Sequence, residues 1–101
     1  MKVKNFENNK KQFIIENEEN TFFQSYDSMI AKIDDVGVLW LGADWGYSVT
    51  TLKYLYKFIN EYKYKMNSYI YNILSNFQDI KNKKQYIQKL IDDNIISIIT
   101  L

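Results

Sequence analysis

Hydrophobic and polar residues follow one pattern before residue 42 and another after residue 48. In the first part, apolar residues come in short runs, at residues 12–16, 21–26 and 38–41, separated by polar or turn-forming residues. Runs of this length that are rich in aromatic and β-branched residues favour strands, and residues 17–20 and 34–37 have the composition of turns. Together with a shorter run at residues 3–6, followed by a turn at residues 8–10, the pattern predicts an antiparallel meander of four or five strands.

Residues 27–33 fit two interpretations. Met29, Ala31 and Ile33 alternate as they would in a strand, whereas Met29, Ile30 and Ile33 would share one face of a short helix. We favour a strand, because a turn and a further apolar run follow at once.

After residue 48 the apolar residues recur with the period of a helix. Leu52, Leu55, Ile59 and Tyr62 form a stripe that would cover one face of the sheet. The opposite side of this helix would carry a set of polar and aromatic residues, namely Lys53, Tyr54, Lys57, Glu61 and Tyr64.

The start of this helix supports two interpretations. Ser48 is the expected N-cap, because its hydroxyl can accept a hydrogen bond from the amide of Thr50 or Thr51. Hydroxyl groups and free amides at a helix N-terminus can also bind phosphate. Neither a glycine-rich loop nor an adjacent lysine accompanies them, so we assign Ser48 and Thr51 to the helix cap.

The rest of the chain continues the helical pattern. A second apolar stripe at residues 66–77 is out of phase with the first, which predicts a bend near residues 63–65. Residues 83–92 predict a third helix, and the β-branched residues that follow predict a strand within residues 95–100. The expected fold is therefore one α+β domain over residues 1–101. It has an N-terminal antiparallel β-meander (1–42), two or three helices packed on one face (48–93) and a short C-terminal strand (95–100).

The composition excludes most catalytic chemistry. The 101 residues contain no histidine and no cysteine, which removes the usual general base, most zinc sites and all thiolate chemistry. Two pairs of adjacent aspartates are present, at residues 34–35 and 92–93, but neighbours on a turn do not face each other across a cleft as catalytic carboxylates do. We therefore predict no enzyme activity, no metal site and no cofactor.

The lengths of the hydrophobic runs also indicate where in the cell the protein is found. None approaches the ~20 residues that cross a bilayer, and the N-terminal residues lack the apolar core of a signal peptide. These features predict a cytoplasmic protein that does not bind membranes.

Charge is divided between the two halves of the chain. Residues 1–50 contain five lysines and eight carboxylates, a net charge of −3, whereas residues 51–101 contain eight lysines and four carboxylates, a net charge of +4. Every basic residue is lysine, so the bidentate contacts that arginine makes with phosphate or guanine are missing. This division of charge favours a protein with one acidic and one basic side, which could bind complementary surfaces on a partner or on a second copy. The alternative is that both halves are ordinary solvated surface.

The main candidate binding surface interleaves lysines with tyrosines along and beyond the first helix. Its members are Lys53, Tyr54, Lys57, Tyr64 and Lys65. Lysines attract phosphate and tyrosines stack on bases, as in proteins that hold single-stranded nucleic acid. The same composition suits a protein interface, because tyrosine gives a large contact area, and it also suits a solvated helix face.

A second candidate surface is acidic. It consists of Glu18, Glu19, Asp34 and Asp35, with further carboxylates at residues 16, 27 and 44. These carboxylates would face a basic groove, such as that of a nucleic-acid-handling protein, and would steer association with it at low salt.

Two segments carry a family resemblance. The sequence SYDSMIA at residues 25–31 and the sequence YSVTTLKY at residues 47–54, in this order and at this separation, resemble a family of small uncharacterised proteins from phages, plasmids and other mobile elements. The resemblance covers about residues 21–64 and implies a mobile-element origin without an established activity. Many members of that family have histidine at the position of Tyr54.

These observations lead to three hypotheses about function. The first is a non-enzymatic phage or mobile-element protein that binds and inhibits a host protein, with an anti-CRISPR or another counter-defence factor as the concrete form. The alternative is a nucleic-acid-binding accessory protein that uses the lysine–tyrosine helix face. The third is a homo-oligomer, assembled through pairing of the strand edge at residues 95–99.

Overall fold

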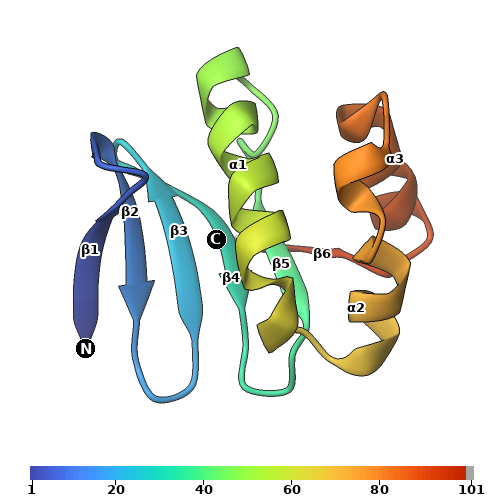
Figure 1. Cartoon of the computed structure of the whole chain (residues 1–101), viewed down its shortest axis with the longest axis horizontal. Helices are drawn as coiled ribbons and strands as arrows, with labels where there is room; N and C mark the ends of the chain where they lie inside the picture. The colour runs from blue at the N-terminus through green and yellow to red at the C-terminus, as the bar shows by residue number, and fades with distance from the viewer. Residues whose placement is uncertain (100–101) are drawn as a thin grey trace.

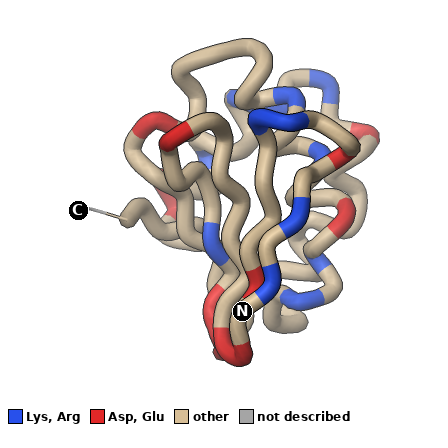
Figure 2. Tube along the Cα trace, turned by 90° about the vertical axis from the view of Figure 1, so that its left-hand side faces the viewer, with Lys and Arg blue, Asp and Glu red and all other residues tan. Residues whose placement is uncertain are grey.

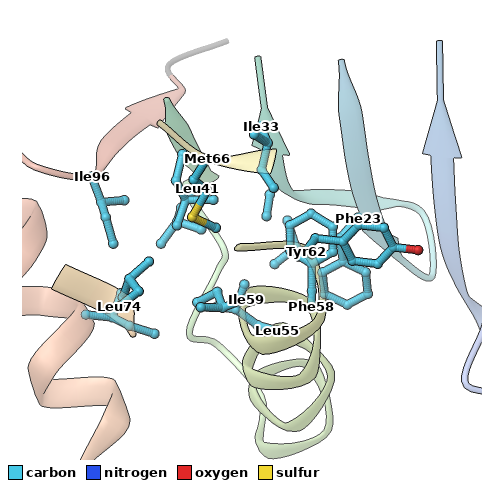
Figure 3. Close-up of a cluster of buried hydrophobic side chains, with 14 of the residues drawn as sticks. Phe23, Ile33, Leu41, Leu55, Phe58, Ile59, Tyr62, Met66, Leu74 and Ile96 are labelled. Carbon is cyan, nitrogen blue, oxygen red and sulfur yellow. The ribbon is translucent and has the colours of Figure 1, made fainter. Parts of the chain in front are cut away.

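The sheet-forming and helical halves of the chain build two layers. The computed structural model describes residues 1–99 and places a six-stranded sheet beneath three α-helices. All three helices lie on one face of the sheet (Figures 1 and 3). This arrangement confirms the predicted α+β class, including the short C-terminal strand.

The strands follow one another across the sheet in sequence order. Five of them form an antiparallel meander: β1 (Lys2–Phe6), β2 (Asn9–Glu16), β3 (Thr21–Ser25), β4 (Ser28–Ile33) and β5 (Leu39–Gly42). β6 (Ser97–Ile99) lies beside β5 and runs parallel to it, so the whole helical segment forms the crossover between the two. β6 is shorter than predicted, and residue 100 of the predicted strand lies outside the described residues. The segment at residues 28–33 is a strand, as we favoured.

The turns depend on residues that tolerate a left-handed backbone. Glu7 and Asn8 both have positive φ, at 54° and 58°, so the first turn lies there and not at residues 8–10 as predicted. Gly37, at φ +80°, closes the turn between β4 and β5, and glycine takes this conformation without steric penalty.

α1 (Val49–Tyr62) packs its apolar stripe onto the sheet (Figure 3). Leu55, Ile59 and Tyr62 are buried, as the helical period predicted, and Leu52 is half-buried. Phe58 was missing from the predicted stripe but is fully buried, and its ring stacks on Phe23 at 5.7 Å between centroids.

The predicted bend after the first helix is present. A 3-10 turn, η1 (Lys63–Lys65), separates α1 from α2 (Ser68–Leu74), and Asn67 caps α2 by accepting a hydrogen bond from the amide of Ile70 at 2.9 Å. A second 3-10 turn, η2 (Phe77–Asp79), leads to α3 (Lys83–Asp92), which has the bounds predicted from the sequence. None of the helices within residues 1–99 combines the length and the apolar character that spanning a membrane requires.

Candidate partner-binding surfaces

The hydroxyl groups at the start of α1 take part in the fold. The Ser48 Oγ accepts a hydrogen bond from the Thr51 amide at 3.0 Å, and the buried Thr51 hydroxyl lies 3.2 Å from that of Ser25 at the end of β3. The two segments that carry the family resemblance therefore meet at this point, where Ser25 belongs to one and Thr51 to the other. Because their hydroxyls are engaged within the protein, the helix cap explains them without a bound phosphate.

Tyr54 is held by contacts with the first hairpin. It was predicted to lie on the solvent side of α1, but it is half-buried, because the turn between β1 and β2 folds against it. Its hydroxyl accepts a hydrogen bond from the Asn9 side-chain amide at 2.9 Å, and its ring packs edge-on against Phe6. The ammonium groups of Lys53 and Lys57 lie 5.7 and 5.5 Å from the centre of the same ring. The ring is thus already occupied by cations and by the core, which leaves little of its face for stacking on a base.

The other members of the lysine–tyrosine surface lie at the far end of α1. Tyr64 is exposed and its ring stacks beside Tyr62, with 6.2 Å between centroids. The Lys65 ammonium donates hydrogen bonds to Glu16 at 2.8 Å and to Thr21 at 3.0 Å. The bond from Lys65 lowers the pKa of Glu16 against the opposing effect of burial. The predicted surface is therefore divided into Lys53, Tyr54 and Lys57 at the start of α1, and Tyr64 and Lys65 beyond its end.

The predicted acidic residues come together. The β2–β3 and β4–β5 turns lie side by side at one end of the sheet, where Glu18, Glu19, Asp34 and Asp35 line a hollow of about 270 Å³. Figure 2 shows acidic positions gathered at the lower end of the molecule, where these turns lie. Lys65 lies on the wall of this hollow, but its charge is engaged with Glu16. We call these four carboxylates the acidic end.

Asp34 has a structural role within the acidic end. One carboxylate oxygen accepts hydrogen bonds from the amides of Val36 and Val38, and the other accepts from the indole of Trp40 at 2.9 Å. Burial opposes the charge, but the bonds from Trp40 and the two amides, with the nearby Lys32, outweigh it and lower the pKa of Asp34. Asp34 is therefore charged at neutral pH and holds the β4–β5 turn in place.

The face of the sheet away from the helices carries an apolar surface that the sequence analysis did not identify. Strand register places six residues in one row across all six strands: Val3, Ile15, Phe22, Lys32, Trp40 and Ser97. Phe13 and Met29 lie on the same face in the next row, through their pairing with Gln24. We call these eight residues the open face, because no helix within residues 1–99 covers them (Figure 1).

A signal for the open face was present in the sequence. In β2 the fully buried Ile14 lies between Phe13 and Ile15, and in β3 Phe22 precedes the buried Phe23. A strand with one solvated face normally alternates apolar and polar residues, so apolar residues on both faces indicate contact on both sides. The prediction of strands at residues 12–16 and 21–26 did not include this second apolar face.

A second hollow lies at the other end of the sheet. It has a volume of about 400 Å³ and is lined by residues of the β3–β4 turn, the end of β5 and β6, among them Asp27, Asp44 and Ile99. Carboxylates therefore lie at both ends of the strands. Among the described residues, no group of three or more acidic side chains is arranged to hold a metal ion.

Comparison with known proteins places the chain in a family. The model of a family of unknown function, DUF8033, matches residues 1–76, so the chain belongs to that family. The matched region contains the meander, α1 and α2 and ends before α3. No curated protein and no solved structure matches the chain.

Proposed function

We propose that this member of the family is a non-enzymatic protein of a phage or another mobile element that binds and inhibits a host protein. An anti-CRISPR or another counter-defence factor is the concrete form of this proposal. Its main support is the acidic end, where two hairpin turns place four carboxylates around one hollow. The absence of histidine and cysteine from the sequence agrees with a protein that acts by binding.

The charge of the acidic end defines the kind of partner. Its carboxylates come from two turns, at residues 18–19 and 34–35, that are 15 or more residues apart in sequence, and the lysine beside them is paired. A protein that handles nucleic acid carries a basic groove, and carboxylates placed against such a groove accelerate association and give specificity. The proposed partner is therefore a basic host protein, and the resemblance to phage and plasmid proteins favours a component of host defence.

Capture from a host lysate tests this proposal. Tagged protein should retain a basic host protein, and Glu18→Gln/Glu19→Gln should retain at least tenfold less of it, because both changes remove charge from the acidic end. Asp79→Asn/Asp92→Asn is the matched control, since it removes the same charge from exposed positions in the helical layer. Equal retention by the two variants would contradict the proposal.

The same preparation tests the alternative. Binding to single-stranded oligonucleotides that weakens steeply with salt, and that Lys53→Glu/Lys57→Glu abolishes, would support a nucleic-acid-binding accessory protein in place of an inhibitor. Lys53 is exposed and Lys57 makes only a long ion pair with Glu7 at 3.9 Å, so both remain available for such contacts.

A further inference from the structure

β1 forms one edge of the sheet, and its outer side is open. It pairs with β2 on one side, and nothing within residues 1–99 lies along the other, as Figure 2 shows from that side. Four of its five residues are exposed. The opposite edge, β6, has three residues in the described part of the chain, so β1 is the longer template for an added strand.

The ladder of hydrogen bonds determines which groups of β1 face outward. Along a strand between two antiparallel neighbours, alternate residues bond to one neighbour and then to the other. The amide of Asn17, just after β2, bonds to the carbonyl of Asn20 at 3.0 Å, so every second residue before Asn17 also bonds to β3. The β2 residues in between, which pair with Lys2 and Lys4, therefore bond to β1.

Val3 and Asn5 are left with their amide and carbonyl groups turned away from the sheet. These four groups have the spacing that a further antiparallel strand needs. An extended segment can therefore add to the sheet through main-chain hydrogen bonds, and the side chains of β1 decide which segment fits.

Those side chains are basic on one face and apolar on the other. Lys2 and Lys4 are exposed on the helix-facing side, whereas Val3, 57% exposed, belongs to the open face. An acidic residue opposite each lysine and an apolar residue opposite Val3 would form favourable cross-strand pairs.

Two carboxylates lie on the inner side of these lysines. Glu16 of β2 accepts a hydrogen bond from the Lys65 ammonium at 2.8 Å. The Tyr62 hydroxyl, and to a smaller extent Glu16 and Glu61, raise the pKa of Lys4, so its ammonium stays charged. Because both carboxylates belong to elements inward of β1, the lysines are the charges nearest to an added strand (Figure 1).

Further carboxylates lie beyond both ends of β1. Glu7 lies in the β1–β2 turn at one end, and Glu18 and Glu19 line a hollow with Met1 at the other. Acidic residues of a partner segment therefore fit only at its centre, opposite the two lysines.

A second copy does not meet these requirements. Two antiparallel β1 strands related by a two-fold axis can pair Val3 with Asn5, which sets Lys4 against Lys4, or Val3 with Val3, which sets Lys2 against Lys4. Like charges directly opposite are destabilising. Pairing Asn5 with Asn5 leaves an overlap of residues 4–6 only, and β6 of another copy offers no carboxylate within its described residues.

We propose that the outer edge of β1 binds an extended segment of a partner protein, which adds to the sheet as an antiparallel strand. The segment has acidic residues at two alternate positions, opposite Lys4 and Lys2, and an apolar residue between them, opposite Val3. Main-chain bonds supply affinity and the alternating side chains supply specificity. The inference goes beyond the proposed function, because the acidic end binds a basic surface and this edge binds an acidic segment.

Amide hydrogen exchange, followed by NMR on the intact protein, tests the inference. The probe is a capped six-residue peptide with the order threonine, glutamate, valine, glutamate, valine, threonine. In the free protein the amides of Val3 and Asn5 should exchange rapidly and that of Lys4 slowly, because only the last bonds to β2. Peptide at about ten times its Kd should slow the exchange of the first two amides about tenfold.

Altered peptides separate strand addition from attraction between charges. N-methylation of the first valine removes a main-chain bond to β1 and should abolish the protection. N-methylation of the two glutamates, whose amides face away from β1, should leave the protection in place. A peptide with lysine in place of both glutamates should not bind.

A change in the backbone locates the binding on β1. Val3→Pro removes an outward amide and leaves the bonds to β2, since proline is tolerated in an edge strand where the amide faces solvent. It should abolish protection of the Asn5 amide by the peptide. Val3→Thr keeps both the amide and the strand, and it should bind within about twofold of wild type.

A change in charge gives a second test that does not depend on tolerance of proline. Lys2→Gln/Lys4→Gln should weaken peptide binding about fivefold, because two cross-strand ion pairs are lost. Lys81→Gln/Lys84→Gln removes the same charge from exposed positions between η2 and the first turn of α3, and it should leave binding unchanged.

Other results would overturn the inference. Exchange at Val3 and Asn5 that stays the same up to the highest soluble peptide concentration excludes this edge. Equal protection by the lysine peptide, or by the peptide methylated at valine, excludes the proposed segment. Slow exchange of both amides in the free protein, with a dimer in analytical ultracentrifugation, would assign the edge to a second copy.

Discussion

Gln12 is the one side chain in the described core whose polar atoms have no partner. It lies on the helix-facing side of β2, is fully buried, and its amide nitrogen and oxygen make no hydrogen bond within residues 1–99. A buried polar group without a partner costs about 1–3 kcal/mol. We therefore expect Gln12→Met, which keeps the length of the side chain, to raise the free energy of unfolding by about 1 kcal/mol. Urea denaturation measures this as a higher midpoint with an unchanged slope.

The neighbouring residue supplies the comparison for that experiment. Ser25 pairs with Gln12 across the strands, but its hydroxyl lies within hydrogen-bonding distance of Thr51. Ser25→Ala leaves the Thr51 hydroxyl unpaired and should lower the free energy of unfolding by about 1 kcal/mol. A loss of stability in Gln12→Met would contradict the interpretation of Gln12 as a buried amide that costs stability.

Single residues were predictable where their contacts are local. Ser48 caps a helix that starts at the next residue, so its role follows from neighbouring sequence alone. Tyr54 was misassigned because its partners, Asn9 and Phe6, lie more than 30 residues away in sequence. Phe58 was left out of the predicted stripe, although it comes three residues after Leu55 and the helical period places it on the buried side. Helical period determines which side of a helix a residue occupies, but it does not show how far the sheet extends around that helix.

At the scale of elements, Gly37 joins the sheet to the helical layer. Its carbonyl accepts a hydrogen bond from the Asn67 amide at 2.9 Å, which docks the β4–β5 turn onto the segment between α1 and α2. A Cβ at this position would overlap the backbone nitrogen of Asn67 and lie 2.8 Å from the carbonyl carbon of Met66, and φ is +80°. We expect Gly37→Ala to lower the free energy of unfolding by about 3 kcal/mol, measured by urea denaturation.

Gly46 provides the matched control for this prediction. A Cβ there would meet only the flexible end of Lys84, at 3.2 Å from Cε, and its φ is not positive. Gly46→Ala should therefore change stability by less than about 0.5 kcal/mol. Similar effects of the two substitutions would show that the β4–β5 turn moves freely against the bend.

The helices and strands that could be predicted are those whose bounds are specified by nearby sequence. The bounds of α3 follow from the apolar period of the helix and from the cap at Asn82, the residue immediately before it. The position of β6 beside β5 depends on the crossover that three helices make, and nothing in residues 95–99 specifies that neighbour. The members of the open face depend on a neighbour in the same way, since the row from Val3 to Ser97 exists only once all six strands are in register; the apolar runs of β2 and β3 signal a second apolar face but not its extent.

For the molecule as a whole, the division of charge in the sequence becomes a division between layers. α1 starts at Val49, so the half with a net charge of −3 is the five-stranded meander, and the half with a net charge of +4 is mainly the helical layer. This could be predicted, because the change from strand to helix coincides with the change in charge. Which carboxylates converge at the acidic end could not, because that depends on two hairpin turns lying side by side.

The ion pair between Glu16 and Lys65 ties the two layers together and gives stability a pH dependence. The hydrogen bond from Lys65 lowers the pKa of Glu16 below its usual value of 4.5. A carboxyl with a lowered pKa contributes stability that is complete above its unfolded pKa and is lost as the pH falls through its folded pKa. We expect Glu16→Gln to lower the free energy of unfolding by about 0.5–1 kcal/mol at pH 7, and the difference from wild type to shrink towards zero below pH 4.5.

Glu61 should respond in the opposite sense in the same denaturation series. Burial of its carboxyl and the nearby Glu7 raise the pKa of Glu61, so its charge opposes folding as the pH rises through the folded pKa. Glu61→Gln should therefore be more stable than wild type at pH 7 and lose that advantage in acid. Both variants could instead have the same free energy of unfolding as wild type at every pH. That result would show that the contacts of Glu16 with Lys65 and of Glu61 with Glu7 are not formed in solution.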